Sequence, residues 1–270
     1  AIIEGISCGN VFELFYDSNR LHLMYKDNLG STYRYARCID LANWNIAAGW
    51  QTFGADKYKE IVAASIKSAS QWWLGDNGYL VLSTSAGEVY PYSWDEGTTT
   101  WSTGGGFGYA TAQYVQLAVV DGWEAFIVIS MTGKTLRSRT TEHLDMAAFK
   151  MPASWHRING APGYDDLSTY STLRCTYPCI AAQLGGLVIT GTNEGAVNKV
   201  LALSWIGSWQ EEEAWPNIPY RLSTASYVSI GSGAIFTPNS EWAFIAVPDY
   251  SGLAVVLLRE EGGDGIWNVW

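Results

Sequence analysis

Apolar and polar residues alternate along most of this chain, which is the pattern of β-strands with one buried face. Apolar positions at helical spacing are scarce. The alternation predicts strands, separated by glycine-containing turns, at VFELFYD (11–17), EIVAASIKS (60–68), YLVLSTS (79–85), YVQLAVVD (114–121), EAFIVIS (124–130), CIAAQL (179–184), KVLALSW (199–205) and EWAFIAV (241–247). The sequence therefore predicts an all-β protein.

Glycine and tryptophan recur at a nearly constant interval. A glycine expected between a second and a third strand precedes a tryptophan in the pairs Gly30–Trp44, Gly87–Trp101, Gly133–Trp155, Gly195–Trp209 and Gly252–Trp267. The intervals within the pairs are 14, 14, 22, 14 and 15 residues, and successive tryptophans are 57, 54, 54 and 58 residues apart. The third interval is longer because it contains the insertion TTEHLDMAAF (140–149), for which we expect one short helical turn.

Five repeats of four strands each predict a five-bladed β-propeller with antiparallel blades. Glycine permits the tight turn between the second and third strands. The tryptophan on each outer strand is expected to pack over the neighbouring blade. A six-bladed ring and a stacked pair of β-sandwiches are the alternative folds. The prediction is a single domain over 1–270, with blades at about 1–50, 58–105, 113–160, 172–216 and 222–270.

Composition supports a globular fold and excludes some partners. Hydrophobic residues make up 48% of the 270 positions and charged residues 16%, which is enough apolar material for a core. The net charge of −10 makes nucleic acid an unfavourable partner. No apolar run approaches the roughly 18 residues of a membrane span. The many aromatic residues favour a homodimer, because large apolar patches are seldom left bare.

The four cysteines bear on the compartment. We expect two disulfides, Cys8–Cys38 and Cys175–Cys179, and with them a secreted protein, to which a start at Ala1 instead of Met also points. The alternative is four buried thiols in a cytosolic protein. The spacing lacks paired CxxC motifs or histidine partners, so a zinc site is not expected.

Several segments follow a known repeat layout. They are EIVAAS (60–65), YLVLSTSAGEVYPYSW (79–94), TTTWSTGG (98–105), CIAAQL (179–184), KVLALSW (199–205) and SWQEEE (208–213). This layout resembles the repeats of the fungal fucose-specific lectins, which are six-bladed propellers. The resemblance implies sugar pockets between blades, each with an arginine from strand 2, a glutamate from strand 3 and nearby aromatic rings.

This sequence departs from that pattern at every blade. The arginine position falls on His22, Leu80, Phe126, Gly186 or Leu187, and Trp242. The glutamate position falls on Tyr35, Pro91 and Ser138, and near Ala202 and Val255. A sugar would leave its hydroxyls unpaired in such pockets, at a cost of about 1–3 kcal/mol each. Apolar, aromatic-lined pockets suit an apolar small molecule instead.

The divergence of the blades favours one specialised site. The chain is similar in architecture to the lectin-like hetero-Diels–Alderases of tropolonic sesquiterpene biosynthesis. That resemblance implies a secreted, cofactor-independent pericyclase that joins an apolar terpene to a quinone-methide partner by orientation and hydrogen bonding. The alternatives are a lectin of altered sugar specificity and a five-bladed glycosidase using inner-strand carboxylates. Those carboxylates would be Glu13, Asp17, Glu60 and Asp121.

A pericyclase needs aromatic walls and hydrogen-bond donors. The candidate catalytic donors are Tyr25, Lys67, Gln183, His156 and Arg157. The candidate substrate-binding residues are Trp72, Trp73, Trp94, Tyr109, Phe126, Trp123 and Trp242. Each has a plainer structural role open to it: core packing for the tryptophans, a strand cap for Tyr25, and solvated or salt-bridged surface positions for Lys67, His156 and Arg157.

Overall fold

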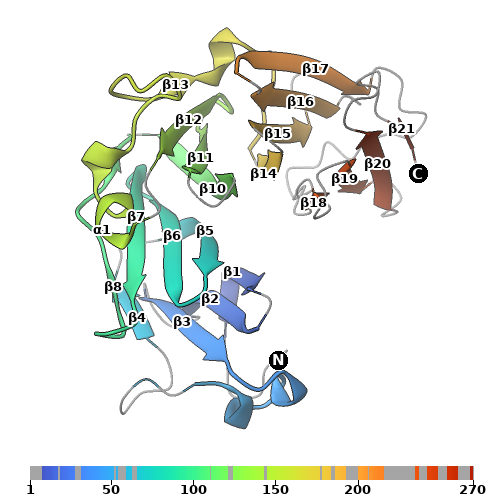
Figure 1. The fold of residues 1–270 in the computed structure, drawn as a ribbon. Coiled ribbons are helices and arrows are strands. Elements are labelled where there is room, and N and C mark those ends of the chain that lie inside the picture. Colours follow the sequence, from blue (N-terminus) through green and yellow to red (C-terminus); the bar gives the residue numbers. More distant parts are fainter. Residues whose placement is uncertain are drawn as a thin grey trace. The chain divides into compact units, whose positions relative to one another are not determined.

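The fold is described from a computed structural model of the 270-residue chain. It describes residues 8–17, 19–27, 32–51, 53, 59–62, 66–109, 111–120, 124–142, 145–176, 178–183, 186–192, 200–205, 207–215, 235–236, 242–248, 254–260 and 268–269. Within these residues the strands form five antiparallel sheets, which confirms the all-β prediction (Figure 1). None of the helices in this described part is long and apolar enough to cross a membrane.

The chain divides into two compact units. Unit 1 comprises Ala1–Val115 and Asp145–Ser154, and unit 2 comprises Gln116–Leu144 and Trp155–Trp270. The boundary falls inside strand β10 (Ala112–Val120). The segment Asp145–Ser154 therefore belongs to unit 1, although the residues on both sides of it in the sequence belong to unit 2.

The first sheet shows where the chain passes from one sheet to the next. Its order is β1-β2-β3-β4, with bounds Cys8–Tyr16, Leu21–Asp27, Thr32–Cys38 and Lys59–Val62. Between β3 and β4 lie the 3₁₀ helices η1 (Leu41–Asn43) and η2 (Ala47–Gly49). The predicted strand 60–68 is thus two strands, because Val62 pairs with Thr32 while Ile66 pairs with Thr84 of the second sheet.

The second sheet of unit 1 contains three long strands, of nine, eight and eight residues. Its order is β5-β6-β7-β8, and a further strand β9 pairs with β7. The bounds are Ile66–Leu74, Asn77–Thr84, Glu88–Asp95, Thr100–Ser102 and Phe107–Gly108. Gly87 has a φ of 81° in the turn between β6 and β7, a backbone conformation that favours glycine, as predicted.

Most of the third sheet lies in unit 2, and three short helical segments follow its third strand along the chain. The sheet order is β10-β11-β12-β13, with β11 at Glu124–Met131, β12 at Leu136–Thr141 and β13 at Asp165–Asp166. The helical segments are α1 (Met146–Phe149), η3 (Pro152–Ser154) and η4 (Leu167–Thr169). The insertion predicted as one helical turn is α1, and together with η3 it belongs to unit 1.

The last two sheets have the same antiparallel order of consecutive strands. The fourth is β14-β15-β16-β17, with bounds Cys179–Gln183, Gly186–Thr192, Val200–Trp205 and Trp209–Trp215. The fifth is β18-β19-β20-β21, with bounds Ile235–Phe236, Trp242–Pro248, Ala254–Glu260 and Asn268–Val269. Apart from segment 60–68, each predicted strand coincides with one strand to within a few residues.

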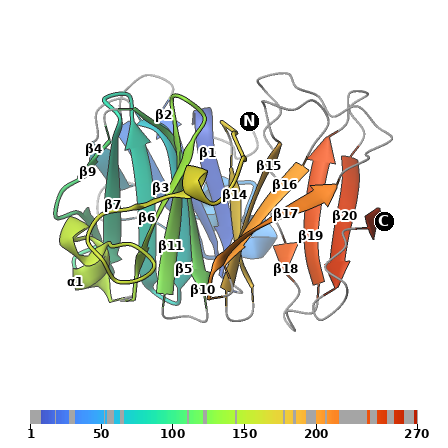
Figure 2. The same ribbon diagram turned by 90° about the horizontal axis from the view of Figure 1, so that it is seen from above.

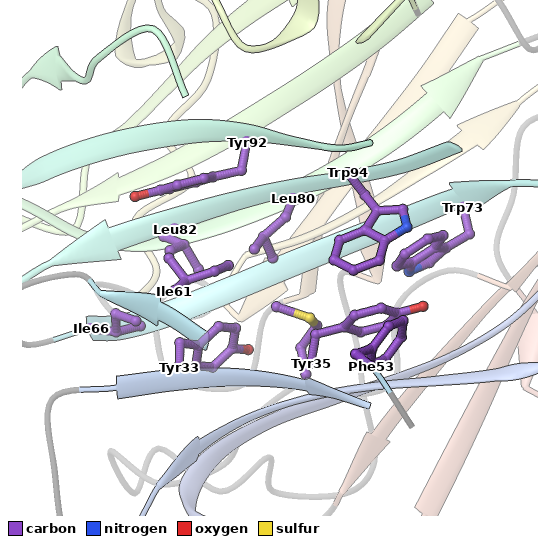
Figure 3. Packing of buried hydrophobic residues seen from close by; sticks show 11 residues of the cluster. Tyr33, Tyr35, Phe53, Ile61, Ile66, Trp73, Leu80, Leu82, Tyr92 and Trp94 are labelled. Atoms are coloured by element: carbon purple, nitrogen blue, oxygen red, sulfur yellow. The ribbon is translucent and has the colours of Figure 1, made fainter. Parts of the chain in front are cut away.

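The core of unit 1 lies between its two sheets and is dominated by aromatic rings (Figure 3). Tyr35 stacks against Trp73 with ring centroids 4.9 Å apart and meets Trp94 edge-on at the same distance. Phe53 also packs edge-on against Trp94, at 5.3 Å. Large rings in offset and edge-on contact bury much apolar area, so this cluster is a main source of stability in unit 1.

The Gly–Trp spacing has two different structural outcomes in this unit. Trp101, on β8, packs edge-on against Tyr35 of the first sheet at 5.6 Å, as expected for an outer-strand tryptophan. Trp44 follows η1 and is 43% exposed. The nearby Trp50 is 3% exposed, pairs with Cys38 through an isolated β-bridge, and packs in a separate cluster with Leu23 and Tyr25.

Neither expected disulfide is formed. Cys8 lies opposite Asp27 at one end of β2, whereas Cys38 lies opposite Leu21 at the other end. An offset of six residues along a strand is about 20 Å, far beyond the roughly 7 Å that a bridge can span. Cys38 is a thiol whose Sγ donates to the Asp40 carbonyl at 3.3 Å.

Cys175 and Cys179 are also thiols. The N–H of Cys175 donates to the Lys134 carbonyl, and its own carbonyl accepts from Ser130, so Cys175 is held beside β11 and β12. Cys179 opens β14 in a different sheet, and burial raises its pKa to about 12. The cysteines therefore give no support to secretion, which stays a prediction.

Candidate functional site

A pocket of about 370 Å³ lies in unit 1, between the outer strands of the second sheet and α1. Figure 2 shows α1 beside β7, and the two elements are in contact. The pocket is lined by Ser93, Asp95, Ser102, Asp145, Met146, Ala147 and Lys150. Its size falls in the range of about 300–1,000 Å³ that is typical of small-molecule sites.

Strand β7 supplies Ser93 and Asp95 to the pocket because side chains alternate between the faces of a strand. Trp94 and Tyr92 point into the aromatic core towards the first sheet. Ser93 and Asp95 consequently lie on the opposite face, which the insertion partly covers.

The insertion supplies Asp145, Met146 and Ala147 to the lining, and Lys150 follows it directly. Asp145 has an extended backbone (φ −84°, ψ 143°), and its side chain accepts the Ala148 N–H at 2.7 Å. This N-cap starts α1 where it does. Phe149 is fully buried and packs edge-on against Tyr79 of β6, at 4.8 Å between ring centroids. The helix is therefore anchored by its apolar side and presents its polar start to the pocket.

Three hydrogen bonds fix the insertion to the second sheet. Ser93 Oγ donates to the Met146 carbonyl at 2.8 Å, and Lys150 Nζ donates to Ser102 Oγ at 3.1 Å. The Gly104 N–H donates to the Lys150 carbonyl at 2.9 Å. A Cβ at Gly104 would lie 2.3 Å from the sulfur of Met151, whose exposed side chain would have to move aside.

The pocket is charged and retains hydrogen-bonding capacity. Hydrogen bonds from the Thr98 side chain and backbone hold the pKa of Asp95 below its usual range, with a further contribution from the charge of Lys150. Lys150 uses one of its three N–H donors on Ser102. Two carboxylates and one ammonium leave a local charge of −1. Such a site can accept hydrogen bonds from hydroxyl groups and donate others to them.

A second polar group lies inside the aromatic core and is closed to solvent. His22 is fully buried, stacks on Trp73 at 3.9 Å, and bonds to Tyr35 through Nδ1 at 2.9 Å and to Asp17 through Nε2 at 3.0 Å. Burial lowers the pKa of His22 to about 4. The neutral ring therefore donates to the Asp17 carboxylate and accepts from the Tyr35 hydroxyl. The linked hydrogen bonds of Asp17, His22 and Tyr35 therefore position residues of the core.

Arg37 and Glu96 form an ion pair that sequence reasoning missed. Arg37 is 2% exposed, and its two terminal nitrogens donate to the two Glu96 oxygens at 3.0 and 2.8 Å. Its Nε donates to Gln51, and Trp94 Nε1 donates to Glu96 at 2.7 Å. Arg37 lies on β3 and Glu96 follows β7, so the pair differs from the strand-2 arginine and strand-3 glutamate of the lectin repeats. These bonds occupy Arg37, which is unavailable to a ligand.

We expect Glu96→Gln to lower the free energy of unfolding by about 1–2 kcal/mol, because the buried guanidinium loses half of a bidentate charged pair. Urea unfolding at neutral pH measures the change. Glu60→Gln is the matched control, since Glu60 pairs with Arg34 at 3.0 Å on an exposed surface. Exposed pairs contribute at most about 1 kcal/mol. Equal effects of the two substitutions would contradict a structural role for the Arg37–Glu96 pair.

The structure brings together only two of the predicted aromatic wall residues of unit 1. Trp73 and Trp94 meet with centroids 6.5 Å apart, but in the packed core. Trp72 packs instead on Phe15 at 5.2 Å. Tyr109 is buried beside Phe107, with centroids 6.4 Å apart. In unit 2, Phe126 is buried in the apolar cluster of the third and fourth sheets.

The predicted donors are also dispersed. Tyr25 is buried in a cluster with Leu23 on the face of the first sheet away from the aromatic core. Lys67 Nζ donates to Gln113 at 2.6 Å. In unit 2, His156 Nδ1 bonds to the Arg157 carbonyl at 2.7 Å in an exposed position. Their catalytic roles stay predictions.

The remaining candidates fall outside the described side chains. They are Trp123, Gln183 and Trp242, of which only the backbones of the last two lie in described strands, β14 and β19. Among the proposed glycosidase carboxylates, Asp121 is also outside the described residues. Within the described part of the chain, no group of three or more His, Cys, Asp or Glu residues could hold a metal ion.

Comparisons with known proteins place the fold. No protein-family model matches the sequence, and no curated protein matches it. Among solved structures, the BP39L lectin from Burkholderia pseudomallei gives a TM-score of 0.58 at 12% identity, over 96% of this chain and 68% of the lectin. A variant of the Aleuria aurantia lectin in complex with Fucα1-6GlcNAc gives 0.57 at 10% identity, over 96% and 77%.

The structure of a glycoside hydrolase is also similar in fold. An engineered GH43 glycoside hydrolase gives a TM-score of 0.53 at 12% identity, over 96% of this chain and 51% of the hydrolase. At such identities the likeness shows the fold alone. The chain accordingly has an all-β fold like that of the lectin propellers, and its chemistry has to be argued from its own residues.

Proposed function

We propose that this protein binds carbohydrate, and that the pocket between β7, β8 and α1 is its binding site. The observation that carries the proposal is the lining of this pocket, where hydroxyl, carboxylate and ammonium groups converge beside the apolar Met146 side chain. Sugars offer hydroxyl groups for such donors and acceptors and an apolar face for a hydrophobic contact. The similar lectin folds support the same conclusion.

An apolar terpene is less suited to this chain. The hypothesis of a pericyclase depended on aromatic walls, and Trp73 and Trp94 are instead buried in the core. The charged pocket would leave its own polar groups unpaired against an apolar ligand.

We retain the five-bladed ring over 1–270 and secretion as parts of the proposal. Five four-strand repeats in the sequence support the blade number.

The inner-strand carboxylates that the glycosidase alternative would use do not share a site among the described residues. Glu13 accepts from Ser70 at 3.2 Å, and Asp17 bonds to His22. Glu60 is on the surface and pairs with Arg34. These three carboxylates serve separate contacts, so hydrolysis at a central funnel is not proposed.

The test is glycan-array binding of the labelled protein, followed by titration of any glycan that binds. We expect Ala147→Trp to weaken binding at least about tenfold, because an indole added on α1 fills the pocket. Ala147 is exposed, so the substitution should leave stability unchanged. Ala42→Trp is the control, since Ala42 is exposed on the short helix η1 of the same unit. Failure of the wild-type protein to bind any glycan, or equal affinity of both variants, would overturn the proposal.

A further inference from the structure

The charges of the pocket point to a narrower class of ligand. Asp95 and Asp145 bring two carboxylates to the lining, and Lys150 brings one ammonium. Each aspartate accepts backbone N–H groups through Oδ1, so each is held in one orientation. A carboxylate has about four acceptor sites, and these backbone bonds leave capacity on both groups.

Lys150 does not neutralise both carboxylates. Its Nζ is bonded to Ser102 on the β8 side of the pocket, and its charge lowers the pKa of Asp95. One negative charge is therefore left uncompensated at the site. The whole chain is also acidic, with a net charge of −10. A neutral sugar would leave this local imbalance unchanged, and an acidic sugar would increase it.

We propose that the pocket selects an amino sugar whose amine is unacetylated and positively charged. The ammonium of such a residue can donate to both Asp95 and Asp145, while the ring hydroxyls bond to Lys150 and Ser102. This inference rests on the proposed function, because it assigns a sugar class to the same pocket. It goes further, because it predicts discrimination between sugars that differ in one charged group.

The expected discrimination is moderate because the pocket is open to solvent. Solvent-exposed ion pairs contribute little each, so two of them correspond to about a threefold to tenfold gain in affinity. The gain should shrink at about 0.5 M salt, where exposed charges are screened. Hydrogen bonds to neutral hydroxyls would not show this dependence on salt.

The test compares three probes by isothermal titration at about pH 6, where an amine is protonated. The probes are methyl β-D-glucosaminide, its N-acetyl derivative and methyl β-D-glucoside. We expect the glucosaminide to bind about threefold to tenfold more tightly than the other two. Equal affinities for the three would overturn the inference and leave the proposed function intact. Absence of binding to all three and to a glycan array would overturn both.

Two substitutions locate the effect. Asp95→Asn and Asp145→Asn each keep a side-chain oxygen for the backbone N–H bonds, so the turn and the N-cap are preserved. Each should lower the preference for the charged amine over the neutral glucoside to less than about twofold. Asp40→Asn is the matched control, because Asp40 caps η1 in the same way outside the pocket. An unchanged preference in both pocket variants would overturn the inference.

Discussion

Replacing Trp94 with alanine is expected to lower the free energy of unfolding by about 3–5 kcal/mol, the usual cost of truncating a buried large aromatic side chain. Trp94 is fully buried and packs against Tyr35, Phe53 and Trp101 at centroid distances of 4.9, 5.3 and 5.4 Å. The substitution also removes the indole N–H that donates to Glu96. Urea unfolding followed by circular dichroism measures the loss.

The control for this substitution is Trp44→Ala. Trp44 is 43% exposed, and only its backbone carbonyl is used, as the acceptor for the Trp50 indole. We expect a change below about 1 kcal/mol, as for most surface substitutions. If Trp94→Ala leaves too little folded protein to measure, Trp94→Phe keeps most of the ring and should lose about 1–2 kcal/mol through the missing hydrogen bond. A loss no larger than that of Trp44→Ala would contradict the described core.

Glu13→Gln is expected to stabilise the protein at alkaline pH and to change little in acid. Burial raises the pKa of Glu13 from 4.5 to about 8, and its Oε2 is a buried atom without a hydrogen-bond partner. The hydroxyl of Tyr33, also buried, has no partner either. The environment therefore favours the protonated, uncharged carboxyl group.

The sign of the pH dependence follows from this shift. The folded state binds the proton more tightly than the unfolded state, so the stabilisation is complete below pH 4.5 and is lost as the pH rises towards 8. Above about pH 8 the wild-type protein has to ionise a buried carboxyl, and glutamine avoids this. A gain of roughly 3–5 kcal/mol is expected there.

Unfolding free energies measured between about pH 5 and pH 9 test this expectation, with Glu60→Gln as the control. The Glu60 side chain is 48% exposed, so its substitution removes no buried carboxyl group. If both variants and the wild-type protein have parallel profiles, Glu13 ionises normally and the described burial is wrong.

Local patterns in the sequence predicted the strands because alternation and glycine turns are short-range signals. They could not show that segment 60–68 belongs to two sheets. Val62 and Ile66 are both apolar, and only their different partners, Thr32 and Thr84, separate them. The partner of a strand is decided by distant residues, which a window of the sequence does not contain.

The constant Gly–Trp interval also did not predict where each tryptophan lies in the fold. Trp44 and Trp101 follow their glycines at the same interval of 14 residues, yet one is exposed and the other packs in the core. In the first sheet, the residues that follow the third strand, β3, form two 3₁₀ helices. In the second sheet, the residues at the corresponding place after β7 form the outer strand β8. The expected Cys8–Cys38 disulfide is also wrong, because β2 lies between strands β1 and β3, which carry the two cysteines.

The candidate site was only partly visible in the sequence. The alternation in β7 places Ser93 and Asp95 on the face opposite Trp94, and Asp145 lies three residues before Ala148, as an N-cap does. The sequence therefore contained both halves of the pocket. Their meeting depends on contacts such as Ser93–Met146 across 53 residues, which no local signal reports.

The segment between β12 and η3 supplies lining residues of the pocket, while other residues of unit 1 form its core. It contributes Asp145, Met146, Ala147 and Lys150 to the pocket, while the aromatic core and the strand pairings of the second sheet lie elsewhere. A related chain could acquire a new specificity by exchanging this one short segment, with the sheets left as they are. Such a loop is a natural point for evolutionary change, and for grafting foreign sequences in the laboratory.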